Sequence, residues 1–287
     1  MKIGIIGGSG LYDIEGLENS KWVEVDTPFG KPSDEFLTAE YAGKEIIFLP
    51  RHDRGHHILP SELNYTANIY GMKKLGAEMV ISVSAVGSLK KELKPLDIVI
   101  PDQFVDRTNQ SRRTTFFGDG IVAHLGFADP VCMDIGKLVY DAGVSLGINM
   151  HLGGTYLNME GPAFSTKAES NLYRSWGMSI IGMTNMPEAR CCREAELCYA
   201  TMAMVTDYDC WYQEYEEGEV TVDMIIHNLT KNSENAKKIL KEVIPRLPET
   251  RICACKDALK DTIVTSPDAI PKETKKKLSL IIGKYIK

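Results

Sequence analysis

The chain of 287 residues lacks several features that mark particular classes of protein. No stretch approaches the roughly 18 consecutive apolar residues that a membrane-spanning helix needs. Basic residues are not in excess, because 33 Lys and Arg stand against 39 Asp and Glu, which gives a formal net charge of −6. This balance argues against a general affinity for nucleic acid or anionic membrane, since both require a basic surface. We therefore expect neither a nucleic-acid nor a membrane partner.

Signals for secretion and for metal binding are also scarce. The apolar stretch Ile3–Ile6 is too short for a signal peptide and no cleavage site follows it, so we expect a cytoplasmic protein. The seven cysteines include no Cys-x-x-Cys pair and no nearby His, so we expect no metal site. Free thiols are the default in a reducing compartment. Cys132 and Cys198, at the edges of predicted helices, form a candidate disulfide, and the state of Cys253 and Cys255 stays open.

What the chain does contain indicates an α/β fold. With 44% hydrophobic and 25% charged residues it can bury a large core. Apolar β-rich runs alternate with helical patterns, which is typical of three α/β/α layers around a central mixed sheet. The predicted strands cover 2–6, 46–50, 79–83, 98–101, 154–159, 180–183 and 199–205, and predicted helices cover 133–147, 165–176, 187–197, 221–244 and 271–285. Another helix carries Leu63 to Leu75, with Ser61 as its predicted N-cap and Gly76 as its terminator.

The segments between these elements indicate the domain organisation. Without a linker, repeat or low-complexity segment, one domain over residues 1–287 is the simplest interpretation, with a C-terminal helical segment (about 240–287) of uncertain role.

Groups that can bind phosphate follow four of the predicted strands: Ser9 in a glycine-rich loop, Arg51 with His52, Ser84 with the N–H of Ala85, and Thr184. A guanidinium forks onto two phosphate oxygens, and hydroxyl and backbone N–H groups complete the shell. Each signal alone is weak, because Gly-Gly-Ser-Gly is more often a tight turn and an arginine is more often in a surface ion pair. Their common place at strand ends favours one anion site.

Two carboxylates follow another apolar run. Asp207 and Asp209 come after Ala203–Val205, and ligands in open α/β sheets bind at the carboxyl ends of strands. Side chains two apart on a strand share a face, so both can meet one flat heterocycle with a ring nitrogen beside an exocyclic amine. The competing interpretation is an ordinary turn.

Several segments together resemble the 5′-methylthioadenosine phosphorylases of the purine nucleoside phosphorylase superfamily, in order from residue 3 to about 245. They are Gly7–Leu11, Val25–Ser33, Arg51–His52, Ser84–Leu89, Pro101–Thr108, Glu160–Ser165, Met183–Glu188 and Thr206–Trp211. The resemblance implies a nucleoside phosphorylase-like fold and phosphorolysis of methylthioadenosine to adenine and 5-methylthioribose 1-phosphate. It implies no cofactor, with inorganic phosphate as a co-substrate.

The resemblance also assigns site residues. The family's phosphate ligands map onto Ser9, Arg51, His52, Ser84, Ala85 and Thr184. The base contacts map onto Phe164, Ser165, Asp207 and Asp209, with Met183 beside the ribose. The pocket for the 5′ substituent maps onto His56, Val222 and Ile225, with His124 reaching in from a neighbouring subunit. Family members are trimers, some stacked into hexamers, so we expect a homotrimer or a dimer of trimers.

The chemistry of phosphorolysis assigns roles to the two carboxylates. Breaking the N-glycosidic bond builds positive charge on the ribose and negative charge on the purine, so a proton must reach N7. We assign that proton to Asp209, with a pKa raised by burial beside Asp207, and we expect Asp207 to accept from the 6-amino group. The Met183–Glu188 segment is closer to enzymes for 6-oxopurines, which leaves a 5′-methylthioinosine or broad-specificity purine nucleoside phosphorylase as an alternative. A nucleoside hydrolase and a nucleotide-sensing module are rivals from other classes.

Overall fold

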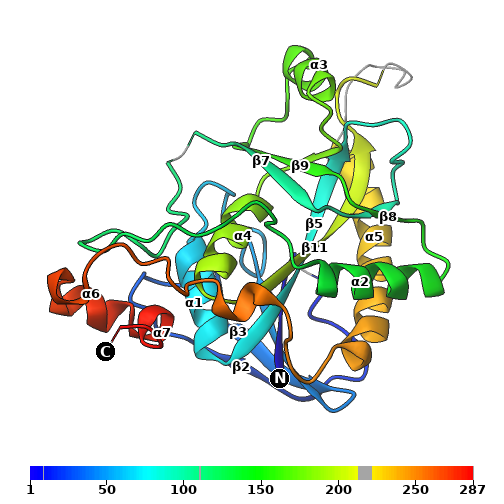
Figure 1. Cartoon of the computed structure of the whole chain (residues 1–287). Coiled ribbons are helices and arrows are strands. Elements are labelled where there is room, and N and C mark those ends of the chain that lie inside the picture. The colour runs from blue at the N-terminus through cyan, green and yellow to red at the C-terminus, as the bar shows by residue number, and fades with distance from the viewer. Residues whose placement is uncertain (9, 110, 213–221, 287) are drawn as a thin grey trace.

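The computed structural model describes residues 1–8, 10–109, 111–212 and 222–286, and of residues 222–225 it describes the backbone alone. Within this part of the chain, one mixed sheet contains the strands (Figure 1). They are β1 (Lys2–Gly7), β2 (Glu18–Val23), β3 (Phe36–Tyr41), β4 (Lys44–Pro50), β5 (Ala77–Ser88), β6 (Ile98–Ile100), β7 (Gln103–Arg107), β8 (Met150–Leu152), β9 (Thr155–Met159), β10 (Ile180–Gly182) and β11 (Cys198–Tyr208).

The long strand β5 is the centre of the sheet. It pairs in parallel with β1 on one side and with β11 on the other. Its last residues pair with antiparallel β10, which leads to β9 and β7. The strand order β2-β3-β4-β1-β5-β10-β9-β7, with β11, β6 and β8 branching from β5, confirms the expected mixed sheet. The carboxyl ends of β5 and β11 therefore lie side by side.

Helices cover both faces of the sheet, as the alternation of apolar residues along the strands requires. Ile3 and Ile5 face α2 (Met133–Ser145) and α5 (Val222–Val243), whereas Ile6 faces α1 (Tyr65–Lys74) and α4 (Asn185–Glu194). Helix α3 (Lys167–Ser175) lies near the far end of β7 and β9 (Figure 1). The predicted α/β/α layering is confirmed. No helix within the described ranges combines the length and apolarity needed to span a bilayer.

The caps of α1 correct one expectation and bear out another. The predicted N-cap, Ser61, lies outside the helix, and Asn64 caps it by accepting a hydrogen bond from the Ala67 N–H. Asn is as good a cap as Ser, and its Nδ2 also donates to the carbonyl of Phe29 at 2.7 Å. Gly76 follows the helix at a φ of +93°, a conformation that favours glycine as a terminator.

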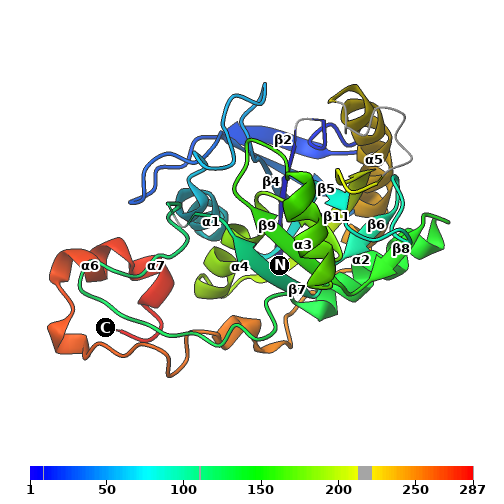
Figure 2. The same ribbon diagram turned by 90° about the horizontal axis from the view of Figure 1, so that it is seen from above.

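The C-terminal segment is less helical than expected. After α5, short 3₁₀ turns at Ile244–Arg246, Ala254–Asp257 and Pro267–Ala269 alternate with irregular chain. The helix predicted over 271–285 is two short helices, α6 (Lys272–Lys277) and α7 (Ser279–Ile282), separated at Leu278. The tail crosses below α1 and α4 (Figure 2), where Leu278 and Ile282 join their apolar core.

The candidate Cys132–Cys198 disulfide is not formed, because all seven cysteines are free thiols. The two residues were rightly expected to be neighbours: both contribute sulfur atoms to a cluster of four.

Candidate active site

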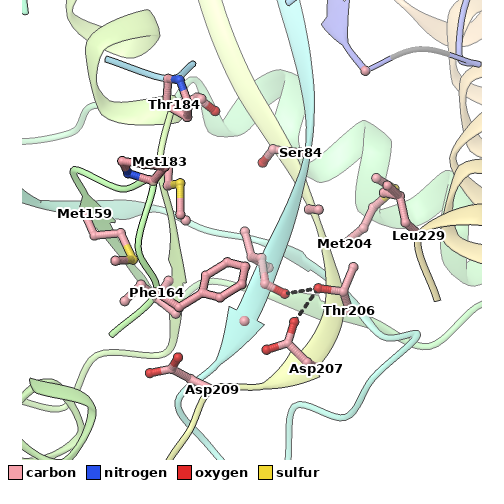
Figure 3. A pocket seen from close by; sticks show the side chains of 18 of the residues that line it. Ser84, Met159, Phe164, Met183, Thr184, Met204, Thr206, Asp207, Asp209 and Leu229 are labelled. Atoms are coloured by element: carbon pink, nitrogen blue, oxygen red, sulfur yellow. Dashed lines mark hydrogen bonds between the residues drawn. The ribbon is translucent and has the colours of Figure 1, made fainter. Parts of the chain in front are cut away.

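A cavity of about 700 Å³ lies where the carboxyl ends of β5, β10 and β11 meet. It brings together most of the site residues expected from the sequence, namely Arg51, His52, His56, Ser84, Ala85, Phe164, Ser165, Met183, Thr184, Asp207 and Asp209. Figure 3 shows Ser84 and Thr184 at one end, Asp207 and Asp209 at the other, and Phe164 and Met183 between them. The cavity is therefore polar at both ends, and the polar groups differ in charge.

Some expected residues are not in this cavity. Ser9 lies outside the described residues, as do the side chains of Val222 and Ile225, although both belong to α5. His124 is exposed and its backbone N–H donates to Thr262 O at 3.0 Å, on a surface that does not line the cavity.

The guanidinium of Arg51 is buried under one end of the cavity, and it is not the surface ion pair that such a residue most often makes. It forks onto Glu188, with Nε 2.5 Å from Oε1 and Nη2 3.2 Å from Oε2. Its Nη2 also donates to Ser82 Oγ at 2.6 Å and its Nη1 to Val83 O at 2.9 Å. Among the described residues one Nη1 hydrogen has no partner, which leaves it for a ligand.

His52 is fixed as a neutral ring. Its Nδ1 donates to the carbonyl of Ile58 at 2.8 Å, and that carbonyl can only accept. Burial first, and then the charge of Arg51, lower the pKa of His52 to about 4. At neutral pH its Nε2 therefore carries a lone pair and accepts hydrogen bonds. The ring of His56 stacks on it at 4.5 Å.

Two further groups complete this end of the cavity. Ser84 Oγ is buried and has no hydrogen-bond partner among the described residues. Thr184 is the N-cap residue of α4, and its side chain makes no cap hydrogen bond. Of the first N–H groups of the helix, that of Met186 already donates to Asn158 Oδ1 at 3.1 Å. Helix N-termini attract anions because their N–H groups carry partial positive charge. Together with Arg51, this end of the cavity can hold a tetrahedral oxyanion.

At the other end, both carboxyl groups are buried, with relative exposures of 7% for Asp207 and 6% for Asp209. Burial raises the pKa of Asp207 to about 6; the Thr206 hydroxyl opposes the rise and the charge of Asp209 adds to it. Burial also raises the pKa of Asp209, and the hydroxyls of Ser170 and Ser165 act against it. Its Oδ2 has no hydrogen-bond partner among the described residues. A proton can therefore reside on this pair near neutral pH.

Thr206 accommodates either protonation state of Asp207. Its Oγ1 lies 2.6 Å from Asp207 Oδ1 and 3.2 Å from the carbonyl of Val86. The hydroxyl has one proton, so it donates to Asp207 when the carboxylate is ionised. When Asp207 is protonated it donates to Thr206, which then donates to Val86. The register shift between Val205 and Asp207 along β5 is a bulge that presents these residues to the cavity.

Sequence reasoning missed several residues that hold this arrangement. Asn228 and Asn232 of α5, one helical turn apart, donate to the carbonyls of Thr206 and Val205 and so fix the bulge. Arg112 is a buried cation that donates to the carbonyls of Met183 and Glu160. Polar residues at i and i+4 on a buried helical face were the available signal for the asparagines. The partners of Arg112 lie too far along the chain for any spacing to show them.

Comparisons with known proteins agree with this geometry. The family model described as the phosphorylase superfamily matches residues 2–245. The S-methyl-5′-thioadenosine phosphorylase of Geobacter sulfurreducens is 56% identical over 99% of both chains. That of Koribacter versatilis is 57% identical over 99% of this chain and 96% of its own.

Two solved structures are similar in fold. A methylthioadenosine phosphorylase from an antarctic soil metagenomic library has a TM-score of 0.92 at 46% identity, covering 97% of this chain and 98% of its own. The Schistosoma mansoni methylthioadenosine phosphorylase in complex with adenine has a TM-score of 0.85 at 34% identity, covering 92% and 99%.

Proposed function

The chain belongs to the phosphorylase superfamily, and on that premise we propose that it converts 5′-methylthioadenosine and phosphate into adenine and 5-methylthioribose 1-phosphate. One observation carries the proposal: a single cavity has an anion-binding end and, opposite it, two carboxyl groups with raised pKa values. The enzyme is a pentosyltransferase. Inorganic phosphate is its co-substrate, and no cofactor is required.

The phosphate-binding end is assigned to Arg51, His52, Ser84, Ala85 and Thr184. A neutral His52 with a free Nε2 lone pair selects a phosphate that still carries a proton, because that P–OH can donate to it. Ser84 Oγ then gains the partner it lacks. The negative charge held here stabilises the positive ribose that forms as the glycosidic bond breaks.

The purine is assigned to the carboxylate end, under Phe164. Asp209 supplies the proton to N7 and Asp207 accepts from the 6-amino group. We assign the sulfur-bearing 5′ substituent to the apolar lining residues Leu59, Pro60 and Leu229, together with His56. The ribose is assigned to the part of the cavity that Met183 and Met159 line (Figure 3).

Reaction products separate this proposal from its rivals. Methylthioadenosine, 5′-methylthioinosine, adenosine and inosine are each incubated with enzyme and phosphate, and the bases are quantified by HPLC. We expect adenine from methylthioadenosine at the highest rate. Faster release of hypoxanthine than of adenine would identify a 6-oxopurine phosphorylase. Equal rates with and without phosphate would identify a hydrolase, and the absence of turnover would identify a binding module.

Replacing Asp207 with Asn should shift preference from methylthioadenosine toward 5′-methylthioinosine. The amide can turn its NH₂ toward O6, whereas a carboxylate and O6 are both acceptors and repel each other. One such hydrogen-bond reversal is worth about 1–3 kcal/mol, or roughly one to two orders of magnitude in the ratio of kcat/KM values. Asp13→Asn removes the same charge at an exposed site and should leave the ratio as in wild type. An unchanged ratio in Asp207→Asn removes this residue from the specificity assignment.

The assembly is proposed to be a homotrimer or a dimer of trimers in which His124 completes a neighbour's 5′ pocket. Exposed apolar side chains beside His124 support this surface as an interface: Val122 is 47% and Val264 67% exposed. Light scattering should give at least three times the chain mass of 31.9 kDa. His124→Ala should raise KM for methylthioadenosine more than for adenosine, which lacks the methylthio group. A monomer at assay concentration contradicts the assembly.

A further inference from the structure

Four cysteines gather at the end of β11 that is remote from the active-site cavity. The sulfur atoms of Cys132, Cys198, Cys253 and Cys255 all lie within 4.8 Å of one another, and Cys198 Sγ is 3.2 Å from Cys253 Sγ. Cys198 begins β11 and Asp207 is near its other end, so about 3.3 Å per residue separates the cluster from the carboxylates by about 30 Å. The cluster plays no part in the chemistry proposed above.

The sulfur positions suit a tetrahedral metal ion. Four thiolates at about 2.3 Å from a zinc ion lie about 3.8 Å from one another, so shifts of a few tenths of an ångström to about one ångström would complete the shell. A disulfide instead requires two sulfurs at about 2.05 Å, well inside the 3.2 Å between Cys198 Sγ and Cys253 Sγ. A shell of four sulfurs with no open position is typical of structural zinc.

The apolar surroundings of the cluster favour a soft cation. Cys132 and Cys198 are 5% and 1% exposed and belong to the apolar core between the sheet and helices α2 and α5, and the partly exposed Cys253 and Cys255 pack against that core.

The four residues come from distant parts of the chain. Cys132 precedes α2 and Cys198 opens β11, whereas Cys253 and Cys255 belong to the tail beyond residue 245, where the family match ends. A few residues further on, the tail pairs with the segment of His124 through an isolated β-bridge between Ala123 and Ile263. A link at the cysteines would therefore fix both the tail and the surface that carries His124.

We propose that Cys132, Cys198, Cys253 and Cys255 bind one structural zinc ion that fastens the C-terminal tail to the start of β11. Binding releases the thiol protons and forms four zinc–sulfur bonds, with no change in oxidation state. The expectation from sequence that this chain has no metal site is thereby replaced, because its ligands have no Cys-x-x-Cys spacing.

Metal content tests the proposal directly. The full chain, purified under reducing conditions, is stripped with chelator, reloaded with zinc, desalted and analysed by mass spectrometry of the metal. We expect about one zinc per chain, lost in the double variant Cys253→Ser, Cys255→Ser and kept in Cys192→Ala, which removes a buried cysteine outside the cluster. Cobalt in place of zinc should give the charge-transfer bands of thiolate ligands. Chelator should lower the Tm of the wild type and not that of the double variant.

Counting thiols in unreduced, denatured protein with chelator present distinguishes zinc from disulfides. Zinc leaves all seven cysteines reactive once it is removed. Five or fewer reactive thiols overturn the proposal in favour of a disulfide. Failure of the fully reduced wild type to retain zinc overturns it as well. Metal content and Tm do not depend on substrate, so they stand whether or not the proposed phosphorolysis is right.

Discussion

Asp209→Asn should lower kcat on methylthioadenosine by about two to four orders of magnitude, which is the usual contribution of a general acid. The amide has nearly the same shape as the carboxyl group and can still donate a hydrogen bond, but it cannot give up a proton to N7. Adenine binding should therefore persist while the leaving purine has to depart as an anion. Steady-state kinetics and calorimetric titration with adenine measure the two quantities separately.

The pH dependence of kcat gives an independent test of the acid role of Asp209. The proton donor must be in its acid form, so kcat of the wild type should fall as the pH rises through the titration of the carboxyl pair. Burial raises the pKa of both members, which places that fall nearer neutral pH than ordinary carboxyl groups would. Asp209→Asn should remove that fall. A near wild-type kcat would show that Asp209 is not the acid, and a larger loss in Asp207→Asn would give that role to Asp207, whose proton Thr206 can support.

The fold was predictable where strands are buried. β1, β4 and β11 are apolar runs that were expected within three residues of their bounds, whereas β5 extends five residues beyond the end predicted for it. β2 was missed because Glu18–Val23 reads as ENSKWV and is mostly exposed. An edge strand of that kind is stabilised by its neighbour β3, which local periodicity does not show.

The site was predictable where its residues directly follow buried strands. Arg51, Ser84, Thr184 and Asp207 follow buried strands, so their common cavity could be expected. Glu188 belongs to the Met183–Glu188 segment, but its partner Arg51 is 137 residues away in the sequence. No sequence spacing predicts that ion pair. Of the cysteine cluster only the neighbours Cys132 and Cys198 were expected, since Cys198 and Cys253 are 55 residues apart. Contacts between distant residues depend on how the layers close around the sheet.

Glu188→Gln should destabilise the protein by about 3–5 kcal/mol, because it leaves the Arg51 charge buried without a counter-ion. Both side chains are 3% exposed, and Ser82 and Tyr199 donate to the same Glu188 oxygen at 2.7 and 3.1 Å. Gln matches Glu in shape, so the loss reports charge and hydrogen bonding and not a cavity. Urea unfolding measures it.

The ion pair of Lys44 and Glu249, in which the carboxylate is exposed, is the matched control. The side chain of Glu249 is 73% exposed, so Glu249→Gln should cost at most about 1 kcal/mol. Phosphate gives a second measure: if it binds beside Arg51, it replaces part of the lost negative charge and should raise the Tm of Glu188→Gln more than that of Glu249→Gln. Equal destabilisation of the two variants would show that the buried pair contributes no more than a surface one. In that case Arg51 would remain charged beneath the cavity without Glu188. Bound phosphate alone would then have to balance the charge of Arg51.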